Sequence, residues 1–480
     1  MSTSMVDRTI EYWKFFRACI VETKSLINRT SKRNVSIAED SDQENVEASP
    51  GTNMEKEYDP YDHVGCENST SFSGTVLHLL ALSLSPTILN IPSTFVKIGY
   101  VNGFIGSFLI IIFYLYCVRS IITTEYTLCK RLRVPNLTYT EVVYYAFQTG
   151  PSCFKGLAKY SRYIVDGNFV CTWIGANSVF VIIACKNIKC FFDYFFDVDM
   201  SIREVMIYIS IPLVLLCCIP NLKYLIPCSI FANFINVSCI VIILCFVIQD
   251  LPSLENRTEY GDLSSVPLFV ATILFTINVT GIIMPLKNEM RNPKSFNTKC
   301  GVLNVFYIPF NLLYSAFGLL CYVKYGDNVK ESVILNLPGR TWSKMIIGMY
   351  GIGICFFFPL NAYVPFDIIW NLISKSKCRI SESSVCNSYL VRATVAFFTI
   401  LLAFVVPNIA LFLSFTGTVG TAIDSMILPA TAEILISIND RNRFCIFFKN
   451  FLIIGLGFVL IVIGMYDGIS HVVAHMKHKH

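Results

Sequence analysis

Charge is scarce in this chain. Only 15% of its 480 residues are Asp, Glu, Lys or Arg, whereas hydrophobic residues make up 54%. The 38 lysines and arginines are scattered among short segments and form no clustered basic face of the kind that binds nucleic acid. The net charge of +5 therefore indicates no nucleic-acid partner.

Signals of catalytic or cofactor chemistry are also missing. No nucleophile, nucleotide-binding loop or pair of catalytic carboxylates stands in a context that supports an enzyme. Many of the nineteen cysteines lie inside apolar runs, where cysteine usually acts as a small packing residue. Their spacing predicts neither a zinc site nor a disulfide framework, although Cys190 is placed where an exposed partner could reach it. We expect no enzyme activity, no bound metal and no cofactor.

Long apolar stretches are what the chain does have. An apolar run of about 20 residues spans the hydrocarbon core of a bilayer, and a soluble domain has no use for many of them. Eleven such stretches predict an all-α, polytopic membrane protein. They lie near residues 75–96, 102–123, 163–185, 204–220, 225–248, 266–286, 302–323, 343–372, 389–406, 409–436 and 446–466.

Polar residues interrupt two of these stretches. The first contains the run Ser83–Thr87, and the sixth contains the run Thr276–Gly281. Interrupted spans at corresponding places in two halves are the best sequence indication of the binding site of a secondary transporter. Hydroxyl and amide groups there suit a polar ligand, although Ser and Thr are also common in membrane helices because they pack closely. The predicted substrate-binding residues are Ser83, Ser85, Thr87, Thr276, Asn278 and Thr280.

The distribution of Lys and Arg among the connecting segments predicts the orientation. Their excess on one side favours a cytoplasmic N-terminus and, with an odd number of spans, an outer C-terminus. Residues 1–70 are predicted to be a largely disordered cytoplasmic segment, 71–467 a transmembrane domain and 468–480 a tail. Asn256 is the predicted glycosylation site, because Asn256-Arg257-Thr258 falls in a sizeable outer segment.

Several longer phrases point to one family. They are Tyr58–His63, Leu77–Leu80, Lys130–Pro135, Pro285–Pro293, Ser332–Pro338, Tyr363–Pro365, Pro407–Phe412 and Pro429–Ile434. With these phrases the chain resembles the proton-coupled amino acid transporter branch of the amino acid/auxin permease family. The resemblance implies eleven spans, with spans 1–5 and 6–10 forming an inverted repeat of the leucine-transporter type. It also implies cavity-lining roles for Trp173, Asn177, Asn361 and Tyr363.

The chain departs from the family pattern at both breaks. Where the family typically reads Gly-Thr-Gly in span 1, this chain has Ser85-Pro86-Thr87. Proline also breaks a helix, but it removes one N–H donor and crowds the approach of a ligand. In span 6, the acidic residue and the glycine that the family often has near Asn278 and Val279 are absent. We therefore expect an altered pocket.

Two ionisable residues inside the predicted spans are candidates for proton coupling. His78 lies about two turns before the break in span 1, and the resemblance makes it a natural proton carrier. Asp424 lies in span 10, where the family is expected to have a neutral residue, and a buried carboxyl group can take up a proton. Each also has a structural interpretation, as a neutral core histidine and as a paired carboxylate. Asp367 and Glu433, near span ends, are expected to be structural.

The sequence thus favours a secondary active transporter that moves a small amino acid or related compound with a proton by alternating access. The alternative is a sensor or scaffold that binds an amino acid without moving it, because the breaks are altered and the N-terminal segment is acidic. The expected partners are the amino acid, the proton and the lipid bilayer. The expected location is the plasma membrane, with the lysosomal membrane as the alternative.

Overall fold

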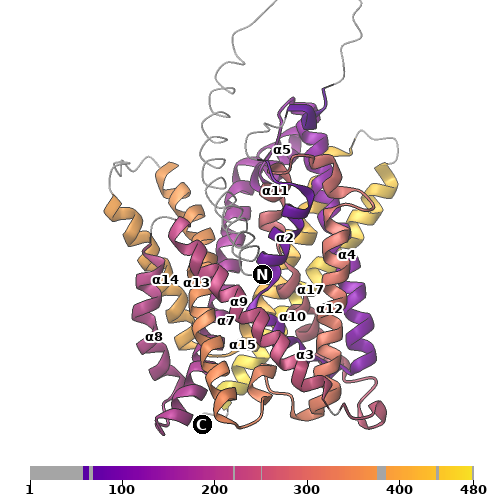
Figure 1. The fold of residues 1–480 in the computed structure, drawn as a ribbon. Coiled ribbons are helices and arrows are strands. Elements are labelled where there is room, and N and C mark those ends of the chain that lie inside the picture. Colours follow the sequence, from indigo (N-terminus) through magenta and orange to yellow (C-terminus); the bar gives the residue numbers. More distant parts are fainter. Residues whose placement is uncertain are drawn as a thin grey trace, which may run out of the picture.

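The described part of the chain is a bundle of helices that run between two ends (Figure 1). A computed structural model describes residues 58–63, 69–219, 222–249, 251–375, 385–438 and 443–477. Within these residues the only β pairing is an isolated bridge between Thr70 and Met290. The all-α prediction is therefore confirmed.

The spanning helices follow the predicted stretches in order. Span 1 is divided into α2, η2 and α3, span 6 into α10 and α11, and span 10 into α15, two π-helical turns and α16. The bounds are α2 (Phe72–Ser83), η2 (Pro86–Asn90), α3 (Ile91–Ile98), α4 (Tyr100–Leu132), α7 (Ala158–Phe195), α8 (Ile202–Cys217), α9 (Leu222–Ile248), α10 (Val266–Ile277), α11 (Thr280–Asn288), α12 (Val302–Tyr325), α13 (Thr341–Lys375), α14 (Val385–Val405), α15 (Ile409–Ser414), η8 (Phe415–Gly420), η9 (Ala422–Ile427), α16 (Leu428–Ile436) and α17 (Arg443–Lys477).

Helix length distinguishes one predicted span from the others. Among the described residues, nine helices are long and apolar enough to cross a bilayer, and the bent pair Phe72–Ser83 and Pro86–Ile98 makes a tenth. The remaining predicted span, the fourth at 204–220, corresponds to α8, whose 16 residues rise only about 24 Å. This helix still packs against α7, α13 and α14, so it belongs to the bundle.

Two ends of the bundle can be distinguished by the segments that gather there. The predicted cytoplasmic end holds η1 (Pro60–His63), α5 (Tyr139–Thr149) and the end of α11 (Figure 1). The predicted outer end holds the segments 196–201, 251–265 and 326–340.

The structure differs from the predicted boundaries at three places. Helix α5 was expected to be a loop, but Thr138 and Glu141 form a capping box at its start. Helix α17 continues to Lys477, into the segment expected to be a tail. Residues 60–63 form the short 3₁₀ helix η1, although the segment to residue 70 was expected to be largely disordered. Residues 1–57 of that predicted disordered segment lie outside the described residues.

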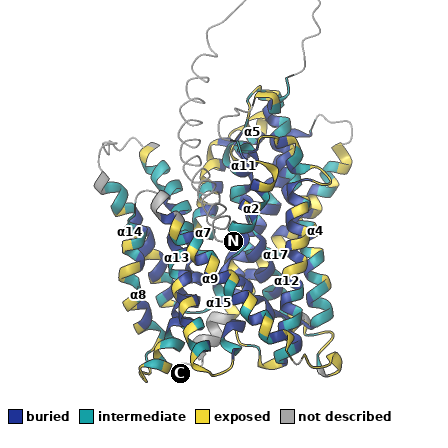
Figure 2. Ribbon diagram, viewed as in Figure 1, coloured by how far each residue is buried: buried dark blue, intermediate teal, exposed yellow. Residues whose placement is uncertain are grey.

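Apolar residues cover much of the outer surface of the bundle. In Figure 2, exposed residues recur along the outer helices, and buried residues fill the centre. On α17, Phe444, Phe451 and Tyr466 are each at least 75% exposed. Such a surface suits lipid, since water would disfavour so many exposed aromatic and aliphatic side chains. The chain is a multi-pass integral membrane protein.

A fully buried ion pair joins span 2 to span 6. Lys287 on α11 donates a hydrogen bond to Glu125 on α4, and the two side chains are 2% and 1% exposed. Cys129 lies one turn further along α4 and donates to the other carboxylate oxygen of Glu125 at 3.6 Å. The ring of Tyr61 lies 5.5 Å from the Lys287 ammonium group. The pair fixes the half-helix α11 against α4 at the predicted cytoplasmic end.

Removing one charge of this pair should be strongly destabilising. Replacing Glu125 with Gln leaves the Lys287 charge buried without its counter-ion, and we expect the free energy of unfolding to fall by roughly 3–5 kcal/mol. Thermal unfolding in detergent measures the loss. The double variant E125L/K287M should regain most of it, because no buried charge remains.

The partly exposed pair between Lys449 and Glu433 provides the control. Their side chains are 34% and 19% exposed, so Lys449→Met should cost less than Glu125→Gln. Equal losses for these two single variants would contradict the role assigned to the buried pair.

Candidate functional site

The break in span 1 has a local cause. Helix α2 ends at Ser83, and Pro86 cannot continue it because proline has no N–H to donate. Ser85 adopts an extended conformation, and its hydroxyl accepts a hydrogen bond from the Thr87 N–H at 3.4 Å. It thereby acts as the N-cap of η2. The two halves of the span are bent by 54°.

The break in span 6 forms without a proline at the break. Helix α10 ends at Ile277, and Asn278 is extended, with φ of −73° and ψ of 106°. The Asn278 side-chain oxygen accepts a hydrogen bond from the N–H of Thr280, where α11 begins, at 3.1 Å. An asparagine that competes for backbone groups therefore takes the role that proline has in span 1. The structure confirms both predicted breaks.

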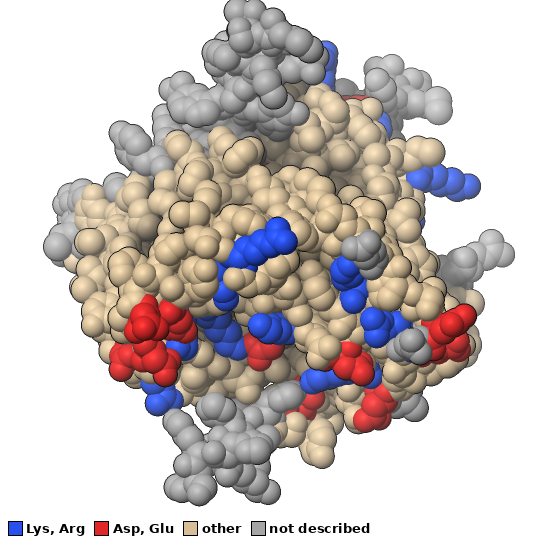
Figure 3. Space-filling view, turned by 60° about the horizontal axis from the view of Figure 1, so that its bottom comes forward, with Lys and Arg blue, Asp and Glu red and all other residues tan. Residues whose placement is uncertain are grey.

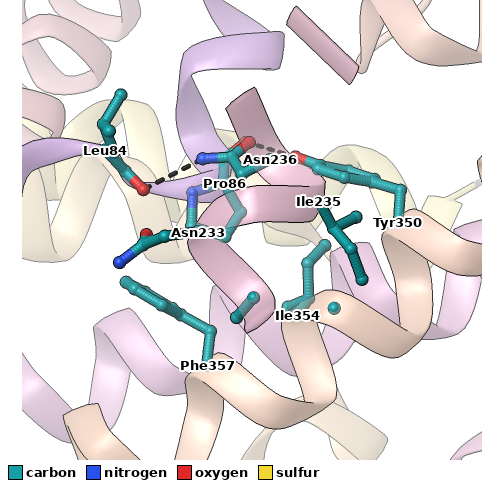
Figure 4. Close-up of a pocket in the computed structure, with 10 residues that line it drawn as sticks. Leu84, Pro86, Asn233, Ile235, Asn236, Tyr350, Ile354 and Phe357 are labelled. Atoms are coloured by element: carbon teal, nitrogen blue, oxygen red, sulfur yellow. Dashed lines mark hydrogen bonds between the residues drawn. The ribbon is translucent and has the colours of Figure 1, made fainter. Parts of the chain in front are cut away.

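Side chains from neighbouring helices bind the carbonyl oxygens released at the span 1 break. Their donors come from α9, α12 and α13, and Figure 4 shows two of them, Asn236 and Tyr350, reaching the break. The pairs are Asn233 Nδ2 with Ala81 O at 3.4 Å, Tyr314 Oη with Ser83 O at 2.8 Å, Asn236 Nδ2 with Leu84 O at 2.9 Å and Tyr350 Oη with Pro86 O at 2.7 Å.

The cavity beside this break is too small for an amino acid. It has a volume of about 10 Å³ and lies between Leu84, Pro86, Asn236, Tyr350 and Phe357 (Figure 4). That space suits about one water molecule. The structure is therefore closed at the span 1 break, and a ligand needs the surrounding helices to move apart.

The two breaks meet through buried hydroxyl groups. Thr87 Oγ1 on η2 lies 3.3 Å from Thr276 Oγ1 on α10, and it lies 3.0 Å from Ser85 Oγ. Thr276 also donates to the main-chain oxygen of Thr272 at 2.7 Å. Ser83 is buried as well, and its hydroxyl oxygen has no hydrogen-bond partner among the described residues. All four predicted ligands are thus buried beside the meeting point of spans 1 and 6.

A second group of polar contacts joins the span 6 break to spans 2 and 10. Tyr114 on α4 accepts a hydrogen bond from the Val279 N–H at 3.1 Å, and its hydroxyl lies 3.0 Å from that of Thr280. The Thr280 hydroxyl lies 2.6 Å from that of Ser425 on η9. Asn278 donates to Thr421 at 3.1 Å. We call Tyr114, Asn278, Thr280, Thr421 and Ser425 the span 6 cluster.

Asp424 is next to this cluster in the chain and is 1% exposed. One carboxylate oxygen accepts a hydrogen bond from Asn168 on α7 at 2.7 Å, and the other has no partner among the described residues. Tyr139 donates to its main-chain oxygen. In the described part of the chain, no basic side chain forms an ion pair with Asp424. If Asp424 is a structural, paired carboxylate, its side-chain partner is therefore Asn168.

The other candidates lie in separate places. His78 is buried on α2, at 7% exposure, before the break. Glu433 binds Lys449 at 2.7 Å and Ser120 at 2.5 Å, which joins α16, α17 and α4. Asp367 accepts a hydrogen bond from Asn371 at 3.2 Å on the same helix.

The residues that the resemblance placed in a cavity do not line the small space at span 1. The residues in question are Trp173, Asn177, Asn361 and Tyr363. Asn256 ends the short helix η3 (Leu254–Asn256) at the predicted outer end. Cys190 is a free cysteine in the structure, and the described residues contain no group of three or more His, Cys, Asp or Glu that could hold a metal.

Sequence reasoning missed Tyr114, Asn168, Asn233, Asn236 and Tyr350. Each is a polar residue in a largely apolar helix, and its partner lies far away in the chain. The only signal in the sequence was a polar residue inside an apolar span. Burying such a residue in lipid is costly, which predicts a hydrogen-bond partner but does not identify it.

The segment before span 1 is tied to the segment after span 6. Lys294 binds Asp59 at 2.7 Å and lies 3.6 Å from Asp62. Thr70 and Met290 form the isolated bridge, in which the Thr70 N–H donates to Glu289 O at 2.8 Å. The two ends of the broken spans are therefore linked at the predicted cytoplasmic end.

This link should weaken in acid. The hydrogen bond from the Lys294 ammonium group holds the pKa of the Asp59 carboxyl below its usual value. The pair of Asp59 and Lys294 therefore stabilises the link fully above about pH 3.9, the pKa of an Asp side chain in the unfolded chain. This stabilisation is lost as pH falls through the lower pKa that Asp59 has in the folded chain. The protection of residues 58–63 against hydrogen exchange, measured relative to the intrinsic exchange rate at each pH, should decrease over that range in the native chain. Asp59→Asn should remove this pH dependence, whereas Asp62→Asn should largely retain it.

The fold and these contacts define a class. The chain is a polytopic membrane protein with two broken spans meeting at a buried polar site. A solved structure described as the inward facing conformation of Mhp1 aligns with a TM-score of 0.51 and 10% identity, covering 82% of each chain. This likeness confirms the leucine-transporter type of fold.

The sequence comparisons give the family. The family described as "Transmembrane amino acid transporter protein" matches residues 68–470, and the chain belongs to it. It is 30% identical over 381 residues to the proton-coupled amino acid transporter-like protein pathetic of Drosophila melanogaster, covering 79% of this chain and 80% of that one. It is 28% identical over 233 residues to the vacuolar amino acid transporter 4 of Saccharomyces cerevisiae, covering 45% and 31%. The predicted family is confirmed.

Tyr114 should prove necessary for the stability of the span 6 break. Tyr114→Phe removes the acceptor of the buried Val279 N–H, and an unsatisfied buried group costs about 1–3 kcal/mol. Thermal unfolding of the purified protein should show this loss. Tyr208→Phe is the control, since Tyr208 is 68% exposed and should have little effect. Equal stability of the two variants would contradict the assigned contact.

Proposed function

We propose that this secondary transporter moves a small amino acid together with a proton. The observation that carries the proposal is the junction of the two breaks, where Thr87 and Thr276 lie 3.3 Å apart. The names of the fruit-fly and yeast relatives support an amino acid as the cargo, and that of the fruit-fly relative supports proton coupling. A transporter role also leaves no need for enzymatic chemistry.

The backbone groups at the breaks suit the two charged ends of an amino acid. A carboxylate prefers N–H donors at the start of a half-helix, and the Val279 N–H at the start of α11 is such a donor. An ammonium group prefers carbonyl oxygens, and Ser83 O, Leu84 O and Pro86 O are released at span 1. Side chains hold all of these groups in the closed structure. A substrate must therefore replace Tyr114 at the amide, or the Asn and Tyr donors at the carbonyls.

Asp424 is the proposed proton carrier. Its charged form leaves one buried oxygen without a hydrogen-bond partner among the described residues, whereas the protonated form carries no net charge. Ser425, the next residue, contacts Thr280 at 2.6 Å. Protonation can thus change the relative free energies of states that differ in the packing of span 10 against span 6. His78 is the second candidate, because it is buried before the other break.

Uptake of radiolabelled amino acids into proteoliposomes tests the proposal. We expect uptake of at least one small amino acid, accelerated by a proton gradient directed along the transport. Asp424→Asn should abolish the response to the gradient, because asparagine cannot take up a proton in this range. Glu433→Gln is the matched control at a carboxylate held by Lys449, and it should retain the response.

Four outcomes separate the alternatives. If His78→Gln loses the acceleration of uptake by the proton gradient and Asp424→Asn retains it, His78 in span 1 is the proton carrier. If the gradient does not change uptake by the native protein, transport is not coupled to protons. Thermal stabilisation by an amino acid without any flux would favour a sensor. Absence of both binding and uptake across a broad panel would overturn the function itself.

Two further proposals concern the membrane in which the protein lies and its glycosylation. We place the protein in the plasma membrane, and the vacuolar relative supports an internal membrane as the alternative. Asn256 at the predicted outer end is the proposed glycosylation site. A mobility shift after glycosidase treatment, absent in Asn256→Gln, tests this assignment.

A further inference from the structure

A larger pocket lies at the predicted outer end, away from the two breaks. Its volume is about 500 Å³, and α7, the start of α8, the start of α13 and the segment 326–340 form its walls. This volume lies in the range of small-molecule sites. Figure 3 views this end of the molecule, where Lys and Arg side chains lie interspersed with Asp and Glu side chains. We call this space the outer lysine pocket.

The ammonium groups in the outer lysine pocket exceed the carboxylates. Lys186, Lys189, Lys330 and Lys344 line it, and Asp193 is its one acidic residue. Two of these lysines have carboxylate partners: Lys189 binds Asp193 at 2.8 Å and also Asp199, and Lys186 binds Glu331. The excess therefore comes from Lys330 and Lys344.

Lys330 and Lys344 have neutral partners instead. Lys330 donates to the main-chain oxygen of Leu335 at 3.2 Å, and Lys344 donates to Cys190 Sγ at 3.2 Å. A thiol and a carbonyl oxygen are weaker partners for an ammonium group than a carboxylate or phosphate oxygen. Among the described residues, neither Lys330 nor Lys344 thus has a carboxylate partner.

The two lysines belong to different parts of the fold. Lys344 is on α13, whereas Lys330 is in the segment 326–340, where its N–H donates to the Asn336 side chain at 2.8 Å. The same segment places the short helix η7 (Val333–Asn336) against η2, and Ile334 is fully buried there. A ligand held between these lysines would join the segment that covers span 1 to the α7 and α13 scaffold.

From this geometry we infer that the outer lysine pocket binds a small oxyanion, a carboxylate or a phosphate group, between Lys330 and Lys344. The bound anion holds the segment 326–340 against α13. The site is distinct from the proposed substrate site, and the inference does not rest on transport. Its occupancy sets how readily that segment separates from η2.

Cys190 provides a direct probe of the pocket. It lines the space beside Lys344, so a thiol reagent must enter the pocket to react. Purified full-length protein is treated with an anionic or a cationic methanethiosulfonate reagent of similar size, and modification of Cys190 is followed by mass spectrometry. Cys190→Ser identifies the signal. We expect the anionic reagent to react several times faster.

Charge variants test the lysines. Lys344→Gln should slow the anionic reagent and speed the cationic reagent, each by up to about fivefold, the effect of one unit charge near 4 Å in water, so that the ratio of the anionic to the cationic rate falls. Lys344→Arg should retain the ratio. Lys97→Gln is the matched control, because Lys97 is exposed at the same end but does not line the pocket, and it should leave the ratio unchanged.

Protection tests the ligand. Sodium phosphate or sodium acetate should slow the modification of Cys190 in the native protein, and sodium chloride at the same ionic strength should not. Protection by these salts in detergent indicates a free anion, whereas protection only in vesicles that contain phosphatidylglycerol indicates a lipid headgroup. Equal rates for the two reagents, or protection that survives in the double variant Lys330→Gln/Lys344→Gln, would overturn the inference.

Discussion

Every backbone group released inside a bilayer must find a partner within the protein, and this constraint organises the centre of the structure. A broken helix exposes N–H and C=O groups where lipid offers no hydrogen bonds. Here the carbonyl oxygens of Ser83, Leu84 and Pro86 are bound by Tyr314, Asn236 and Tyr350. The breaks can therefore persist without a ligand, because the neighbouring helices satisfy them.

The same constraint explains how a closed structure can belong to a transporter. The cavity at span 1 is too small for an amino acid, and side chains hold the backbone groups that are proposed to bind one. Substrate binding then exchanges one set of hydrogen bonds for another, so its net cost is modest. The ion pair between Lys287 and Glu125 meanwhile holds the far half of span 6 to α4.

The sequence predicted the membrane architecture well, because its signals are local. A continuous apolar run marks a span wherever it lies, and Pro86 breaks a helix in almost any surroundings. Helix α5 was missed because it is short and only moderately apolar, and its capping box lies in a segment read as a loop. Helix α8 lies at the predicted fourth span, but its 16 residues make it shorter than the helices that are long enough to cross a bilayer, and hydropathy alone did not reveal this.

What the sequence determined by itself was the family, the order of the spans and the six polar residues at the two breaks. Only the tertiary structure decided which residues complete the site, because Tyr114, Asn236 and Tyr350 reach it from helices distant in the chain. It also decided that Asp424 contacts Asn168 and lies next to the span 6 cluster, and that four lysines from separate segments share one pocket. A run of apolar residues predicts that a helix lies in the membrane. It does not predict which neighbouring side chain a buried polar group will contact, since that depends on how the helices pack against one another.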